Sequence, residues 1–383
     1  MKSETEYELE QTYKFSLNDI VGKSSTSEVY MGYDKKQFTD IAVKTESQFT
    51  LHPQLEHEYS ILSYLNAHSD SLSKFFPTPI KYTKYGNKNY LIMELLGYNL
   101  EQLFSLAKQR FTPLTTFILI SQMLDIIKQL HTCTFIHRDI KPEHFLMSKQ
   151  TTTDLIKPAL DYNHPTSVDP HSKLYLVDYG LTKHYCDPLT KKHLPFKDDR
   201  SFNGGTIFAS SWSHLNIEKS RRDDLDSLSF ILIYFLTGSL PWQHLKTKTK
   251  RELNENISEM KIALTPTELC KCISIEECLK FVHCIRGLQF EQEPNYNYLK
   301  GLLHTMIGKL NVKVMNKKLY MILINNKPED PVNQIKKEEM EDDDNDNGNE
   351  SGNKNRKNDY NNNKYRLSRK LKRDEVVKKQ INK

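Results

Sequence analysis

The sequence has no run of eighteen or more apolar residues, so it predicts no membrane-spanning helix. Its first residues are mostly polar and lack the apolar stretch of a secretory signal peptide. Apolar residues make up only 37% of the chain, and the shortage is concentrated toward the C-terminal end. We therefore expect a folded protein of the cytosol, the nucleus or both, followed by a polar tail.

The sequence also lacks cysteine pairs spaced as in a zinc site, and it lacks a large net charge. The six cysteines include Cys270, Cys272, Cys278 and Cys284, but these spacings do not match a usual zinc site, and we interpret all six as free thiols. The net charge of +5 is modest, and the part that looks folded has no basic stripe interleaved with aromatic residues. We therefore expect no nucleic-acid binding by the folded part.

A short loop between two apolar runs holds the strongest functional signal. Residues 135–147 contain an H-R-D motif that ends at Asp139 and is followed by Lys141, so a carboxylate and an ammonium lie two residues apart. Further along, the strand-like run 174–180 ends in a D-Y-G turn that begins at Asp178. A lone H-R-D tripeptide recurs by chance, but this combination is typical of protein kinases.

A predicted strand closer to the N-terminus carries the sequence I-A-V-K, which ends at Lys44. In kinase strands of this type the lysine holds the nucleotide phosphates, and here Ala42 would cover the adenine ring. A buried lysine needs a carboxylate partner to stay charged. Glu56 and Glu58 of the next predicted helix are both available, and we predict Glu58, which lies one turn before an inward-facing apolar pair.

Glycine is scarce where a kinase covers the nucleotide phosphates. The G-x-G-x-x-G-x-V pattern keeps Gly22 and Val29, but Ser24 and Ser27 replace the other two glycines. Serine is small, yet it lacks part of the backbone freedom of glycine. Two interpretations stay open: a phosphate-covering loop in which Val21, Gly22 and Val29 contact the nucleotide, and a serine-rich hairpin with no nucleotide role.

The pattern at residues 90–97 is that of a buried strand that runs into a glycine, and after it the apolar period changes from two to about 3.6 residues. This change indicates a hinge between a β-rich and a helical part. We expect Met93 at the entrance of the adenine site, and the backbone of Glu94 to Leu96 along the adenine edge. We also expect Leu146 to contact the nucleotide.

Longer strings make the resemblance more specific than kinase motifs alone. They are HPQL at 52–55, MELLG at 93–97, FLM at 145–147, SRRDDL at 220–225 and GSLPW at 238–242. Over about residues 14–310 the chain resembles casein kinase I, and its D-Y-G turn resembles that of the vaccinia-related kinases. The resemblance implies an α+β fold of two lobes, with a small, mostly β N-lobe containing one key helix and a larger, mostly α C-lobe.

The resemblance also implies an ATP-dependent transfer of the γ-phosphate to serine or threonine, with magnesium. Asp139 would orient the acceptor hydroxyl and accept its proton, Lys141 would neutralise the γ-phosphate, and Asp178 would bind magnesium. Lys44 and Glu58 would complete the clamp on the nucleotide. All five residues are present, which favours an active enzyme.

One position departs from the family pattern. His144 stands where the family has an asparagine, whose oxygen takes the second magnesium ion. Magnesium prefers oxygen ligands, so an imidazole predicts one well-held magnesium ion, the use of manganese, or a slow enzyme. Together with the serine-substituted loop, this keeps an alternative open: a weakly active or inactive pseudokinase that acts as a nucleotide-binding scaffold.

The domain boundaries follow from these patterns. We expect a flexible N-terminus at 1–13, the N-lobe at 14–96, the C-lobe at 97–312 with an inserted loop at 148–172, a linker or short helix at 313–335, and a disordered tail at 336–383. The insertion is rich in proline and polar residues and suits docking, regulation or simple filler. The tail is acidic and then basic, which fits a nuclear-import signal, a contact with an anionic surface, an autoinhibitory segment or a merely solvated end.

The expected partners are protein substrates that carry serine or threonine, and we expect a monomer. Lys246, Lys248, Lys250 and Arg251 would attract acidic peptides, although an exposed, solvated helix start is the simpler explanation.

Overall fold

The computed structural model describes residues 6–24, 26–68, 75–149, 173–197 and 205–310, together with the backbone of 166–168 and 319–321. These residues belong to a unit that ends at Leu323, and a second unit, Ile324–Lys383, lies outside them. The expected tail and most of the expected insertion therefore also lie outside the described residues.

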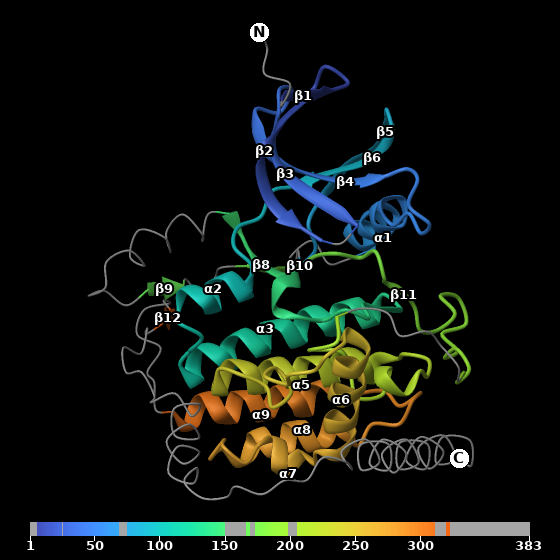
Figure 1. The fold of residues 1–383 in the computed structure, drawn as a ribbon. Helices are drawn as coiled ribbons and strands as arrows, with labels where there is room; N and C mark the ends of the chain where they lie inside the picture. Colours follow the sequence, from blue (N-terminus) through green and yellow to red (C-terminus); the bar gives the residue numbers. More distant parts are fainter. Residues whose placement is uncertain are drawn as a thin grey trace, which may run out of the picture. The chain divides into compact units, whose positions relative to one another are not determined.

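A six-stranded antiparallel sheet forms the N-terminal part of the first unit, with helix α1 (Leu55–His68) against it (Figure 1). The strand order is β1-β2-β3-β4-β6-β5. The strands are β1 (Glu6–Leu9), β2 (Tyr13–Lys23), β3 (Ser27–Asp34), β4 (Thr39–Ser47), β5 (Pro79–Tyr85) and β6 (Lys88–Glu94).

Strand β1 lies in the range that we expected to be a flexible N-terminus. Tyr7 stacks on Phe15 of β2 with ring centroids 5.6 Å apart, and Leu9 is buried in the core of the sheet. The residues Glu6–Leu9 alternate between polar and apolar, as a strand with one buried face does. The polar composition of this segment concealed that alternation.

The alternation of side chains along β4 decides which of them face α1. Ile41 and Val43 pack in a cluster with residues of β1 to β3 and β6 on one face of the sheet. Ala42 packs on the other face, in the core that it shares with α1, and Lys44 reaches Glu58 of α1 on that same face. The I-A-V-K sequence thus directs its alanine and lysine to one side.

Helices form most of the C-terminal part of this unit (Figure 1). They are α2 (Leu100–Leu106), α3 (Pro113–Thr132), α5 (Arg221–Thr237), α6 (Lys250–Ala263), α7 (Pro266–Leu269), α8 (Glu276–Arg286) and α9 (Tyr296–Lys309). The apolar faces of α3, α5, α8 and α9 share one core, which continues to the α1 face of the sheet. Within the described residues, no helix combines the length and the hydropathy that crossing a membrane requires.

Several short strands flank the loops that lie between the N-terminal sheet and the C-terminal helices. They are β7 (Phe135–Ile136), β8 (Phe145–Met147), β10 (Leu174–Leu176) and β11 (Lys183–His184), and the 3-10 turns Pro142–His144 and Ser213–Leu215 accompany them. β8 pairs with β10, and the N–H of Ser148 donates to the carbonyl of Lys173 at 3.0 Å. The insertion therefore leaves from the end of a two-stranded ribbon. Within it, β9 (Thr166–Val168) pairs with β12 (Leu319–Met321), which lies in the range expected as a linker or short helix.

Candidate active site

Lys44 of β4 has its ammonium enclosed by two carboxylates. Its Nζ lies 2.7 Å from Oε2 of Glu58 and 2.9 Å from Oδ1 of Asp178. Burial works to lower the pKa of Lys44, but Asp178 and Glu58 outweigh it and hold the pKa above its ordinary value. The buried lysine therefore stays charged. Of the two glutamates considered from the sequence, Glu58 makes this contact, whereas Glu56 is exposed and pairs with Lys84.

Another buried carboxylate holds the start of α1. Glu46 of β4 accepts hydrogen bonds from the backbone N–H groups of Gln54 at 2.9 Å and Leu55 at 3.3 Å. The open N–H groups and the dipole of a helix N-terminus favour a carboxylate there. Glu46 and Lys44 lie on the same strand. The contact of Glu46 with the start of α1 therefore helps to position Glu58 of that helix opposite Lys44. Sequence reasoning missed Glu46, since a strand residue gives no sign of the distant helix that it contacts.

Asp178 directs each carboxylate oxygen at a different partner. Oδ1 accepts a hydrogen bond from Lys44, and Oδ2 lies 3.1 Å from Nε2 of His144. Burial would raise the pKa of Asp178, but the Lys44 ammonium outweighs it and holds the pKa well below its ordinary value. The backbone at Asp178 has a φ of +69°, a left-handed conformation that aspartate adopts more readily than most residues.

Tyr179 ties the D-Y-G turn into the core. Its backbone N–H donates to Oε1 of Glu58 at 3.2 Å, and its hydroxyl donates to the carbonyl of Leu176 at 2.8 Å. Its buried ring meets Phe76 and His137 edge-on, with centroids 6.0 and 5.4 Å away. The tyrosine therefore packs as an aromatic core residue while its hydroxyl is satisfied.

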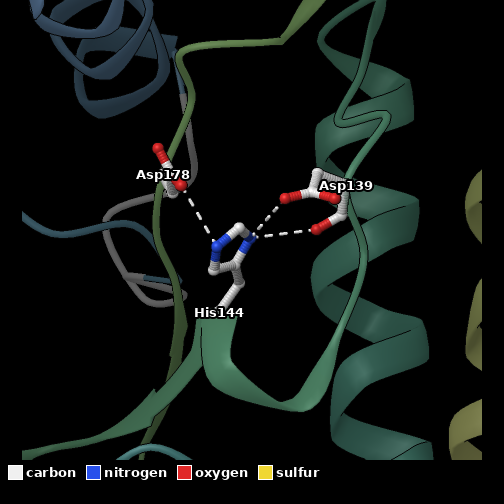
Figure 2. Close-up of side chains that lie close together, drawn as sticks. All are labelled: Asp139, His144 and Asp178. Carbon is white, nitrogen blue, oxygen red and sulfur yellow. Dashed lines mark hydrogen bonds and ion pairs between the residues drawn. The ribbon is translucent and has the colours of Figure 1, made fainter. Parts of the chain in front are cut away.

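Figure 2 shows His144 between the carboxylates of Asp178 and Asp139. Nδ1 of His144 lies 2.9 Å from the backbone oxygen of Asp139 and 3.7 Å from its carboxylate. A carbonyl oxygen only accepts, so Nδ1 donates this hydrogen bond. Nε2 then faces Asp178. Ligand atoms of the three residues lie within 4.8 Å of one another, but the ring stands between the two carboxylates.

Asp139 is held from two sides. Oδ2 accepts from Nζ of Lys141 at 2.8 Å, and Oδ1 accepts from the backbone N–H of Gly205 at 3.1 Å. Burial would raise the pKa of Asp139, but His144, Lys141 and the Gly205 N–H outweigh it, and the pKa lies below its ordinary value. The structure thus places an ionised carboxylate on the loop singled out in the sequence, with its ammonium neighbour attached.

Asp224 of α5 holds the backbone of the loop that contains Asp139. Its carboxylate accepts from the backbone N–H of His137 at 2.8 Å and of Arg138 at 2.9 Å, and it lies 2.9 Å from Nε2 of His131. Burial would raise the pKa of Asp224, but the hydrogen bond to His131 and the charges around it keep the pKa below its ordinary value. Arg138 has a φ of +73°, and these contacts stabilise that left-handed backbone.

The family comparison agrees with this geometry. The family model for the protein kinase domain matches residues 15–286, which is more than half of the chain. The chain belongs to the protein kinase family. Membership implies ATP, a divalent metal ion and protein substrates in general. The two-lobed α+β fold expected from the sequence is confirmed.

In this kinase, the residues expected around adenine divide between buried and exposed positions. Ala42 and Met93 pair across β4 and β6, are both buried, and lie in the core against which the half-buried Val29 packs. Gly22 pairs with Val29 across the β2–β3 hairpin, and Val21 is 48% exposed. Strand pairing thus brings Ala42 next to Met93 and Gly22 next to Val29, whereas Val21 is exposed.

Backbone hydrogen bonds connect the hinge of the kinase to neighbouring segments of the chain. The N–H of Glu94 donates to the carbonyl of Thr78 at 2.9 Å, so this group, within the stretch expected along the adenine edge, is already engaged. The N–H of Gly97 donates to the carbonyl of Met147 at 2.9 Å. Leu96 and Leu146 are half-buried on the two sides of this connection.

The serine-substituted loop closes on itself. The hydroxyl of Ser24 accepts from the backbone N–H groups of Thr26 at 3.3 Å and Ser27 at 3.0 Å. The backbone N–H of Ser24 also donates to the carbonyl of Ser27 at 2.8 Å. Backbone N–H groups are what a kinase loop of this kind turns toward phosphates, and here a side chain occupies two of them. This geometry favours the hairpin interpretation as the structure stands.

A buried lysine supports the segment 205–209. The backbone N–H of Gly205, the first residue of this segment, donates to Asp139 of the catalytic loop, residues 135–147. Nζ of Lys261 in α6 donates to the carbonyls of Thr206 at 2.6 Å and Ala209 at 2.7 Å, and lies 4.9 Å from the ring centroid of Trp242. Burial lowers the pKa of Lys261 well below its ordinary value. Sequence reasoning missed Lys261, because a lysine in an amphipathic helix ordinarily points to water.

Proposed function

We propose that this kinase is a serine/threonine kinase of the casein kinase I type, which transfers the γ-phosphate of ATP to protein hydroxyls. The observation that carries the proposal is the charged arrangement of five residues. Lys44 lies between Glu58 and Asp178, and Asp139 lies against Lys141. Phosphoryl transfer depends on positioning and on charge neutralisation, and these fixed charges suit both. The family-specific strings support the casein kinase I assignment.

Each residue has a task in the proposed reaction. Asp139 accepts a hydrogen bond from the substrate hydroxyl, aligns its oxygen with the γ-phosphorus and takes up its proton late in the transfer. Lys141, already beside Asp139, places its ammonium near the transferring phosphate. Lys44 holds the inner phosphates, and Glu58 keeps that lysine in place. A bound divalent ion neutralises phosphate charge.

The donor set fits a divalent ion. Oδ2 of Asp178 and Nε2 of His144 lie side by side at 3.1 Å, and both atoms are of types that divalent ions bind. Asp178 and His144 are therefore the residues that we assign to it. The second candidate function, a weakly active nucleotide-binding scaffold, is favoured by two observations: the imidazole at the metal site and the closed turn at Ser24.

The test of the proposed function is transfer of labelled γ-phosphate from ATP to dephosphorylated casein, followed by phosphoamino-acid analysis. Casein is acidic, so it also probes the basic residues Lys246, Lys248 and Lys250; Arg251 is paired with Glu255 at 3.1 Å. We expect labelled phosphoserine and phosphothreonine. Bound nucleotide without any transfer would instead support the scaffold, and label on tyrosine alone would refute the serine/threonine assignment.

Replacing Ser24 by glycine should tighten ATP binding. The change removes the hydroxyl that occupies the N–H groups of Thr26 and Ser27, and losing such a bond is worth about 1 kcal/mol, or about fivefold in affinity. The measurement is the KM for ATP. Ser27→Gly is the control for flexibility: it removes the 2.9 Å contact between the two hydroxyls but keeps the Ser24 hydroxyl that accepts from the N–H groups of Thr26 and Ser27. An equal effect of both variants would show that flexibility, and not the freed N–H groups, is responsible.

Replacing His144 by asparagine should raise the magnesium-dependent rate. Asparagine restores an oxygen ligand at this position, and magnesium binds oxygen in preference to nitrogen. We expect the rise to be largest at subsaturating magnesium, where occupancy of the metal site limits the rate. The rate is measured across a magnesium series. An unchanged or lower rate at every concentration would show that His144 is not a defect of the metal site.

A further inference from the structure

We propose that His144 makes this kinase selective for manganese over magnesium, with Nε2 of His144 and Oδ2 of Asp178 as neighbouring ligands of one ion. The inference rests on the proposed function in that the ion is the one that accompanies the nucleotide. It adds the identity of the metal and a nitrogen ligand, where the resemblance implies oxygen ligands.

The first support is the orientation of the ring. Nδ1 donates to the backbone carbonyl of Asp139 at 2.9 Å, which directs the opposite nitrogen, Nε2, toward Asp178. Histidines that bind metals in proteins almost always donate their other ring N–H in this way, and the bond fixes both the tautomer and the ring plane. The side chain of His144 is only 9% exposed, so the ring cannot easily turn away.

The second support is the distance between the two ligand atoms. Neighbouring ligands of an octahedral ion with bonds of about 2.0–2.2 Å lie about 2.8–3.1 Å apart. Nε2 of His144 and Oδ2 of Asp178 are separated by 3.1 Å. The two atoms are thus already spaced as adjacent ligands, and nucleotide phosphates and water can occupy the other positions.

The third support is the placement of Asp139. The ring of His144 stands between the two carboxylates, so Asp139 lies on the Nδ1 side, away from Nε2 (Figure 2). Its own oxygens are engaged by Lys141 and by the N–H of Gly205. The site therefore offers one imidazole nitrogen and one carboxylate oxygen to a single ion. Magnesium strongly favours oxygen ligands, whereas manganese is the softer of the two ions and accepts an imidazole nitrogen beside a carboxylate oxygen more readily.

One other arrangement accounts for the same contact. Nε2 and Oδ2 at 3.1 Å need a cation between two lone pairs, and either a metal ion or a proton supplies it. A proton would make the contact an ion pair that competes with metal binding. The experiment must therefore detect a metal–nitrogen bond directly, and not only a change in rate.

The test is electron paramagnetic resonance of Mn²⁺ bound to the full chain with ADP. We expect electron spin-echo modulation from a directly bound ¹⁴N nucleus in the wild type. Labelling the wild type with ¹⁵N-histidine should replace it by the ¹⁵N pattern, which requires no variant to fold. In His144→Asn the modulation should disappear and the preference for Mn²⁺ over Mg²⁺ should fall. His68→Asn is the matched control, because His68 also bonds a carbonyl, that of Tyr64 at 2.9 Å, but is exposed at the end of α1.

The outcomes separate this inference from the proposed function. Bound Mn²⁺ with ADP but without nitrogen modulation would overturn the inference and leave the proton as the cation at Nε2, whether or not phosphate is transferred. A Mg²⁺ affinity equal to that for Mn²⁺ would overturn the selectivity. Histidine-dependent modulation together with tighter Mn²⁺ binding would support it even if casein is not phosphorylated, in which case only the proposed function fails.

Discussion

Replacing Asp139 by asparagine should reduce phosphate transfer by about 10³-fold while ADP binding persists. Asparagine keeps the size of the side chain and an oxygen that can accept from the N–H of Gly205. It cannot take up the proton of the substrate hydroxyl, and it presents no negative charge to Lys141. The loss should therefore appear in kcat, and the KM for ATP should change little. The measurement is transfer to casein in magnesium and, separately, in manganese.

The matched control for this change is Asp125→Asn. Asp125 lies on α3, is 43% exposed and pairs with Lys300 at the surface, so the same substitution there should leave transfer unchanged. Activity of the Asp139 variant within about threefold of the wild type would mean that proton acceptance by this carboxylate contributes little. Absence of transfer from every variant and from the wild type, with ADP still bound, would make the scaffold the leading interpretation.

Replacing Asp224 by alanine should destabilise the protein by about 3–5 kcal/mol. The carboxylate accepts from the backbone N–H groups of His137 and Arg138 and from the ring of His131, and all three would lose their acceptor inside the protein. This is a large share of the roughly 5–15 kcal/mol that stabilises a typical domain. The loss is measured by urea unfolding, and transfer should fall as well, because the same N–H groups position the catalytic loop.

Two further variants serve as controls for the loss of unfolding free energy in Asp224→Ala. Asp224→Asn keeps one acceptor oxygen, so it should destabilise by less than the alanine variant. Asp125→Ala removes only a partly exposed ion pair, which is worth about 1 kcal/mol. Equal unfolding free energies for Asp224→Ala and Asp125→Ala would show that the three donors find other partners and that α5 does not hold the loop.

Several site residues were predictable because their signal is local. Asp139 and Lys141 lie two residues apart on one loop, and the D-Y-G turn directly follows a short strand, so a few neighbouring residues define each motif. Ala42 and Lys44 were placed on one face by the period of two in a strand. Glu58 was chosen over Glu56 from the inward face of its helix, and the structure brings it to Lys44.

Other features were not predictable, because they depend on contacts between distant segments. Lys44 and Asp178 are separated by 134 positions, and nothing near either residue shows that they meet at 2.9 Å. Glu46 and Lys261 look like ordinary strand and helix residues, and only packing shows that one holds the start of α1 and the other supports residues 205–209. The strand β1 was obscured by its polar composition.

The sequence by itself determined which kinase residues this chain carries: a set of charges on short loops, with an imidazole and two serines in unusual places. These are properties of residue type and spacing, which need no long-range contact. Only the tertiary structure decided what the unusual residues do. Packing placed the ring of His144 between two carboxylates with Nε2 toward Asp178, and the hairpin closed the Ser24 hydroxyl onto its own turn. Direction and distance belong to the packed chain, because several elements must first meet to fix them.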